Sequence, residues 1–127
     1  MSTQGARKRT NRKICILSCS GASNLGQVAN QAALELVEEG FGEGICTAAV
    51  GARVKWAVER LRDAGKIVAI NGCDSECARK ILKDIGRDDA VHVTTSELGI
   101  DKSPGFFMHT YEVEKVKEAV RRAVVEA

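Results

Sequence analysis

The 127-residue sequence lacks the features that mark membrane and secreted proteins. No apolar run approaches the ~18 residues that a membrane-spanning helix needs, and the basic start has no apolar stretch of the kind a secretory signal requires. The low content of proline, with one residue, and of aromatic residues, at 4%, says little about the class of protein. The 44% of hydrophobic and 28% of charged residues exclude a disordered tail protein and a fibrous repeat. A chain of this length forms about one domain, which folds without disulfides or metal. We therefore expect a cytoplasmic protein without membrane contact.

Cysteine is the residue type that is unusually frequent. The chain has five cysteines, which are Cys15, Cys19, Cys46, Cys73 and Cys77. In a reducing compartment an unpaired set of this size favours metal or thiol chemistry over a disulfide framework. The cysteines are therefore the first candidates for function.

Positive charge is concentrated at the start of the chain. The first 13 residues contain no acid and five basic residues, which are Arg7, Lys8, Arg9, Arg12 and Lys13. Subtracting these five from the net charge of +2 leaves about −3 for the rest, which is not a nucleic-acid footprint. The arm could contact RNA or DNA through phosphates, but a solubilising, disordered terminus is the favoured interpretation. We predict such an arm over residues 1–13 and a single domain over residues 14–127, with a protein partner left open.

Apolar patterns along the chain predict a small α/β domain. Short β-rich runs predict strands over residues 14–18, 66–70 and 90–94. Apolar residues at helical spacing predict helices over residues 27–39, 52–64 and 75–85 and from Thr110 onward, the third capped by Asp74 or Ser75. Strands alternating with helices indicate right-handed βαβ units. We therefore expect a three-layer domain in which helices flank a mostly parallel sheet of three or four strands.

Four of the cysteines are predicted to meet at one edge of this sheet. Cys19 follows the first predicted strand and Cys73 the second, with Cys77 four residues later on the first turn of a helix. Ligands gather beyond the carboxyl ends of parallel strands, and four-residue spacing places Cys73 and Cys77 on one helix face. Cys46 reaches the same edge if its segment folds over it. Four thiolates suit a tetrahedral zinc ion or an iron–sulfur cluster, whereas Cys15 lies inside a strand.

Other interpretations of the cysteines are open. Free cysteines are commonly buried as small hydrophobic residues, which is our interpretation of Cys15, and Cys77 also lies on the apolar face of its predicted helix. Successive gaps of 27, 27 and 4 residues from Cys19 to Cys77 are not those of paired zinc knuckles. The helix start favours a thiolate at Cys73, so thiol redox or sulfur transfer, with Cys77 or Cys19 resolving, is a second hypothesis. Whether the protein is an enzyme is left open.

Residues 70–82, with the sequence Ile-Asn-Gly-Cys-Asp-Ser-Glu-Cys-Ala-Arg-Lys-Ile-Leu, resemble the signature of the DGC domain family, named for an Asp-Gly-Cys motif. Cys19 with Ser20 and Gly21, Cys46, and residues 97–102 also resemble that family's pattern, so the resemblance covers the chain from about residue 14 to its end. The family consists of uncharacterised metal-binding proteins of archaea and bacteria whose four cysteines are thought to chelate zinc. The resemblance implies this role for Cys19, Cys46, Cys73 and Cys77. A closed set of thiolates would serve a structural, sensing or metal or sulfur handover role.

One position departs from the family's motif. Asn71 stands where the name-giving Asp would be. An amide can accept hydrogen bonds and cap a turn, but it adds no negative charge and cannot act as a general base. Among weaker candidates, we interpret residues 21–26 as a tight turn more than an anion cradle, His92 as a packing residue, and His109 as solvated or capping. Residues 106–108 predict a flap over the core or a partner-binding patch.

Overall fold

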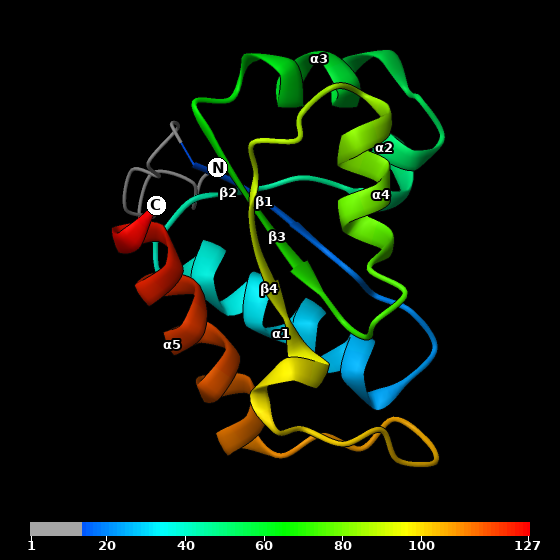
Figure 1. Cartoon of the computed structure of the whole chain (residues 1–127), viewed down its shortest axis with the longest axis vertical. Coiled ribbons are helices and arrows are strands. Elements are labelled where there is room, and N and C mark those ends of the chain that lie inside the picture. The colour runs from blue at the N-terminus through cyan, green and yellow to red at the C-terminus, as the bar shows by residue number, and fades with distance from the viewer. Residues whose placement is uncertain (1–13) are drawn as a thin grey trace.

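The computed structural model describes residues 14–127, and the predicted basic arm, residues 1–13, lies outside the described residues. Its centre is a sheet of four parallel strands in the order β2-β1-β3-β4 (Figure 1). The strands are β1 (Ile14–Ser18), β2 (Glu43–Gly44), β3 (Lys66–Asn71) and β4 (Val91–Thr94). This confirms the predicted small α/β domain with a parallel sheet. The sequence pattern missed β2, because two residues are too few to show a period.

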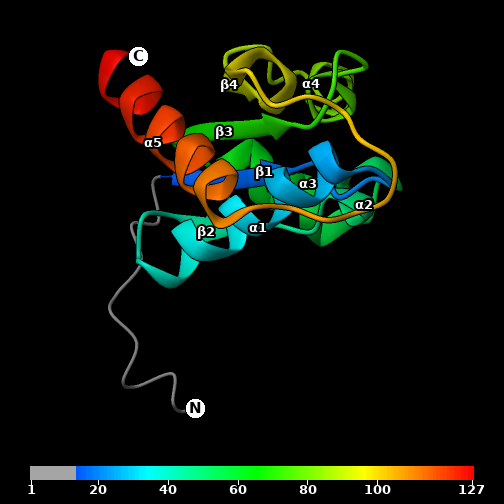
Figure 2. The same ribbon diagram turned by 90° about the horizontal axis from the view of Figure 1, so that it is seen from below.

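Helices cover both faces of the sheet. They are α1 (Asn24–Glu38), α2 (Thr47–Gly51), α3 (Lys55–Asp63), α4 (Cys77–Asp84), the 3-10 helix η1 (Thr95–Leu98) and α5 (Thr110–Glu126). Because successive strand residues point to opposite faces, Ile14 and Ile16 pack with α1 and α5, while Cys15 and Leu17 pack with α2, α3 and α4 (Figures 1 and 2). The result is the predicted three-layer arrangement. No helix within residues 14–127 is long and apolar enough to cross a membrane.

Three helix boundaries differ from those predicted. α1 begins at Asn24 because the Ser23 side chain accepts a hydrogen bond from the Gly26 backbone N–H at 3.1 Å. The helix predicted over residues 52–64 is α3, which begins only at Lys55, and the separate helix α2 before it was not predicted. Between the two helices Arg53 adopts a left-handed φ of 62°, which breaks the helical run. An ion pair of 2.8 Å between Arg53 and Asp84 on α4 accompanies this break. α4 begins at Cys77, two residues later than expected, and neither predicted cap provides its capping side chain.

Arg87 closes the carboxyl end of α3. Its Nη1 donates to the backbone oxygens of Leu61 at 2.7 Å and Ala64 at 2.9 Å, and Asp89 pairs with Nε at 2.9 Å. The Arg87 hydrogen bonds hold the pKa of the Asp89 carboxyl below its usual range. The Leu61 oxygen also accepts the Ala64 N–H at 3.2 Å. Carbonyls at a helix end lack the regular hydrogen bonds of the helix interior, so a charged donor there stabilises the fold.

We expect Arg87→Ala to lower the free energy of unfolding by about 1–2 kcal/mol, because it removes charged donors from these carbonyls. Urea unfolding followed by circular dichroism measures the change. Asp89→Ala is the matched control, since it keeps the bonds to α3 and removes only a solvent-exposed ion pair, so its loss of stability should be clearly smaller. Equal losses in the two variants would contradict this role of Arg87.

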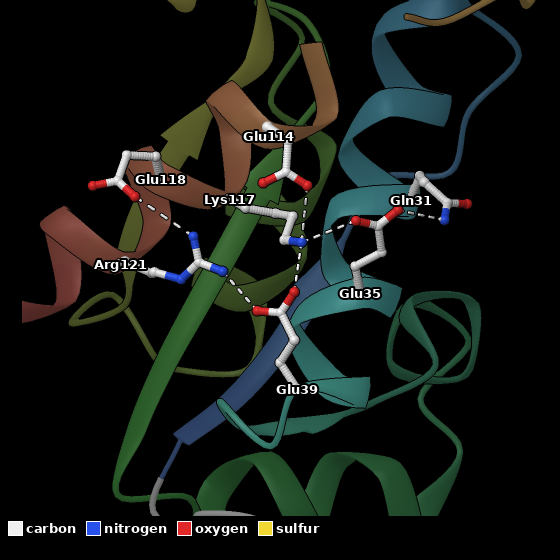
Figure 3. A network of polar contacts seen from close by, with 7 residues as sticks. All are labelled: Gln31, Glu35, Glu39, Glu114, Lys117, Glu118 and Arg121. Carbon is white, nitrogen blue, oxygen red and sulfur yellow. Dashed lines mark hydrogen bonds and ion pairs between the residues drawn. The ribbon is translucent and has the colours of Figure 1, made fainter. Parts of the chain in front are cut away.

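A network of charged side chains joins α1 to α5 (Figure 3). The ammonium of Lys117 on α5, with only 5% of the side chain exposed, lies 3.0 Å from Glu35, 2.5 Å from Glu39 and 3.2 Å from Glu114. Burial acts to lower the pKa of Lys117, but the hydrogen bonds that its ammonium donates to these three carboxylates together outweigh burial and raise that pKa. Arg121 lies 2.6 Å from Glu39 and extends the network. The two helices are therefore joined by charge as well as by apolar packing.

Candidate functional site

The topology brings the four candidate metal ligands to the carboxyl edge of the sheet. Cys46 lies two residues after β2, Cys19 directly follows β1, and Cys73 lies two residues after β3. These are three neighbouring strands of the sheet, and all of them run in the same direction. Cys77 is the first residue of α4, the helix that follows β3. The four residues thus lie on connections at one edge of the domain.

The connections after β1 and β3 are in direct contact. The backbone N–H of Cys19 donates to the Ile70 oxygen at 2.9 Å. Gly72 lies so close to α1 that a Cβ there would be 2.9 Å from Gly26 Cα and 3.2 Å from Cys19 Sγ. Only glycine permits this separation, because real Cβ atoms essentially never approach other heavy atoms below 3.0 Å. Gly72 therefore sets how closely the segment carrying Cys73 approaches Cys19.

Cys46 is tied to the same edge by its neighbours. The Ile45 N–H donates to the Ile16 oxygen at 3.1 Å. The Thr47 hydroxyl donates to the Ser18 oxygen at 2.5 Å, next to Cys19. The sequence predicted that Cys46 reaches this edge only if its segment folds over it, and these contacts hold the segment there. Nothing in the sequence marked Thr47 as the residue that makes one of them. Cys46 is thereby held beside the connection that carries Cys19.

The segment between Cys73 and Cys77 turns through a strained residue. Glu76 has a left-handed φ of 49°, and its N–H donates to the Cys73 oxygen at 3.0 Å. Its carboxylate accepts a hydrogen bond from the Thr94 hydroxyl at 3.2 Å and pairs with Arg79 at 3.1 Å. A non-glycine residue in this conformation costs free energy and persists where its surroundings hold it. Glu76 thus shapes the connection on which both cysteines lie.

The five thiols differ in exposure. Cys15 is 4% exposed in the core, and this burial raises the pKa of its thiol to about 11, which confirms its interpretation as a small packing residue. Cys19 and Cys73 are partly buried against the core that α1 and α5 form. Cys46 and Cys77 are exposed, so the alternative that Cys77 packs as a buried hydrophobic residue is wrong.

The side chains as placed do not surround a single point. Within residues 14–127, no group of three or more His, Cys, Asp or Glu side chains lies close enough together to hold a metal ion. The four-cysteine zinc site therefore stays a prediction. A surface depression of about 430 Å³ beside Cys19, lined by Ser20, Gly21, Ala22, Gln27 and Phe106, leaves that connection open to solvent.

Asn71 is fully buried at the end of β3 and holds the start of α4. Its Oδ1 accepts a hydrogen bond from the backbone N–H of Arg79, the third residue of α4, at 3.1 Å. Its Nδ2 lies 3.4 Å from Nδ1 of His92 on β4. The amide at the motif's Asp position therefore joins three elements of the site. The sequence alone did not indicate that His92 and Thr94 contact residues of the segment between β3 and α4.

The weaker candidates of the sequence, residues 21–26, residues 106–108 and His109, have structural roles or are exposed to solvent. The turn after β1 is filled by its own backbone, since a Cβ on Gly26 would lie 2.8 Å from the Gly21 nitrogen. Of residues 106–108, Met108 is partly buried against the core that α1 and α5 form, whereas Phe106 is 58% and Phe107 is 71% exposed. His109 precedes α5, and its backbone N–H donates to Glu112 at 2.9 Å. Its ring stacks at 5.1 Å on Tyr111.

Comparison with known proteins identifies relatives of the chain. The family model described as the DGC domain matches residues 15–120. A protein of Pseudomonas aeruginosa named anaerobic and virulence modulator AnvM is 34% identical over 101 residues, which cover 80% of this chain and 77% of that protein. No solved structure matches the chain.

Proposed function

We propose, because the chain belongs to the DGC domain family, that it binds one zinc ion through Cys19, Cys46, Cys73 and Cys77. The observation that supports this most directly is that the connections after three adjacent strands carry these cysteines to one edge. Two contacts hold the connections together, the hydrogen bond from Thr47 to Ser18 and the close packing of Gly72 on Gly26. The residues proposed for a tetrahedral thiolate site therefore follow neighbouring strands at this edge.

The chemistry of the donors fits zinc. Zinc in structural sites takes four ligands, and four thiolates form such a site. In this chain two of the four thiols, Cys46 and Cys77, are exposed, so their side chains turn without disturbing the core. Cys19 and Cys73 are partly buried and provide a firmer half of the site. Ion binding would draw the exposed pair toward the partly buried pair.

A sensing or handover role follows from this arrangement. Four protein ligands leave no position for water, which argues against hydrolysis at the metal. Two exposed ligands leave the ion open to exchange with another thiol-bearing protein or to oxidation of its ligands. The name of the Pseudomonas relative describes a modulator, which supports a regulatory role for this chain more than a purely structural one.

Elemental analysis of freshly purified protein tests the proposal. We expect about one zinc per chain in the wild-type protein and loss of the metal in Cys73→Ser and Cys77→Ser. Cys15→Ala is the matched control and should keep its zinc, because Cys15 is buried in the core away from the edge. Wild-type protein that stays free of zinc after incubation with the ion would contradict the proposal. Iron with acid-labile sulfide in place of zinc would support a cluster on the same ligands.

A further inference from the structure

The two ends of the Asn71 side chain have different partners, and this identifies its atoms. The backbone N–H of Arg79 lies 3.1 Å from one end. Because an N–H can only donate, the atom facing it is the amide oxygen. The other end is therefore the NH₂ group, which can only donate, and it lies 3.4 Å from Nδ1 of His92. The orientation of the buried amide is fixed by the backbone alone.

We infer that Asn71 fixes the tautomer of His92, with the proton on Nε2 and the Nδ1 lone pair accepting the Asn71 amide. Neutral imidazole carries one proton, so a ring whose Nδ1 accepts must carry that proton on Nε2. In this state neither nitrogen has a lone pair free to bind a metal ion or to take up a proton. His92 then presents a hydrogen-bond donor at its Nε2. This inference depends only on the contacts of Asn71 and stands whether or not the cysteines bind zinc.

The surroundings of His92 keep the ring neutral. Burial lowers the pKa of His92, and the positive charge of Arg79 lowers it further, while the more weakly acting Glu76 and Asp88 raise it. Thr94, two residues along β4 and on the same face as His92, donates to Glu76 at 3.2 Å. The histidine therefore belongs to a polar cluster between β4 and the start of α4. Asn71 contacts both His92 and the start of α4 and is a positioning residue for the ring.

The departure from the family's motif gives this inference its consequence. An aspartate at position 71 would accept from the Arg79 N–H as Asn71 does, but it would also accept from His92. The imidazole would then carry its proton on Nδ1 and leave the Nε2 lone pair free. Such an Asp–His pair provides a metal ligand or a general base. Asparagine at this position therefore denies His92 both roles.

Nitrogen NMR of the full ¹⁵N-labelled chain tests the inference. Long-range ¹H–¹⁵N correlation spectra at pH 7.5 distinguish a protonated ring nitrogen from an unprotonated one. For His92 in the wild-type protein we expect an unprotonated Nδ1 and a protonated Nε2. The wild-type spectrum decides the tautomer without any variant, and a proton on Nδ1 would overturn the inference.

The variant Asn71→Asp tests whether Asn71 sets this state. We expect the proton of His92 to appear on Nδ1, either in place of the Nε2 proton or in addition to it. Asn30→Asp is the matched control, because it adds the same charge at a half-buried asparagine that contacts Ser18 and not a histidine. The control should keep the wild-type pattern, and the His109 signals serve as an internal reference in all three proteins. An unchanged His92 in Asn71→Asp would overturn the role of Asn71. Zinc content does not enter the readout, so failure here and failure of the zinc proposal are distinguishable.

Discussion

Lys117→Ala is expected to lower the free energy of unfolding by about 2–3 kcal/mol, because it leaves three carboxylates together without their shared cation. The Lys117 ammonium lies within 3.2 Å of Glu35, Glu39 and Glu114, and only 5% of its side chain is exposed. Breaking a fully buried pair costs more than this. The carboxylates here are between 36% and 55% exposed, so solvent screens part of the repulsion that remains.

Arg122→Ala is the matched control for this variant. Arg122 is also a cation of α5, but its side chain is 71% exposed and lies 3.8 Å from Glu118. Removing an exposed pair of this kind changes stability by about 0.5 kcal/mol or less. Urea unfolding of both variants gives the comparison. If the two lose the same small amount of stability, the Lys117 network does not hold α5 on α1.

The pH dependence of the same two proteins provides a second measurement. A hydrogen bond from Gln31 and then one from Lys117 lower the pKa of Glu35 from 4.5, and a hydrogen bond from Lys117 lowers that of Glu39 from the same value. Groups with a lowered pKa stabilise the fold above the unfolded pKa and lose that contribution as the pH falls through the folded one. The difference between wild type and Lys117→Ala should therefore be constant near neutral pH and shrink below pH 4.5. The raised pKa of Lys117 implies a second decrease only above pH 10.5.

The strands and layers could be predicted because they depend on local pattern. The continuous apolar run of β3 indicates burial on both faces, and glycines mark the ends of helices. The break at Arg53 was not predictable in this way, because arginine with a left-handed φ carries no signal like that of glycine. Its conformation is accompanied by contacts to Asp84, which lies far along the chain. Tertiary contacts of this kind do not appear in the periodicity of a segment.

The position of the candidate site could also be predicted, since parallel strands end at one edge. The contacts that hold the connections at this edge could not be predicted. Thr47, Gly72 and Glu76 act through partners between three and fifty-three residues away, and only the structure reveals those pairs. Asn71 is an intermediate case. The sequence showed that an amide can cap where the motif has an acid, and the structure adds that its other end faces His92.

Gly72→Ala is expected to destabilise the protein by about 2–3 kcal/mol, because the added methyl group meets backbone that cannot turn away. The new Cβ would lie 2.9 Å from Gly26 Cα and 3.0 Å from Gly26 N. A flexible side chain could relieve such contacts by rotating, but here only Cys19 Sγ, at 3.2 Å, belongs to a side chain. The connections after β1 and β3 must therefore separate, and the distance between Cys19 and Cys73 must increase.

Gly51→Ala is the control for Gly72→Ala, because it adds the same methyl group where it fits. A Cβ on Gly51 would meet Ile81 Cδ1 at 3.4 Å, an ordinary contact, and alanine is the better helix former at this end of α2. We expect its urea midpoint to stay within about 0.5 kcal/mol of wild type or to rise. Equal stability of the two variants would refute the close approach at Gly72. Zinc measured on folded Gly72→Ala adds a second result, because all four thiols are intact in that variant. Its loss would therefore mean that the spacing of the two connections, and not the number of thiols, limits binding.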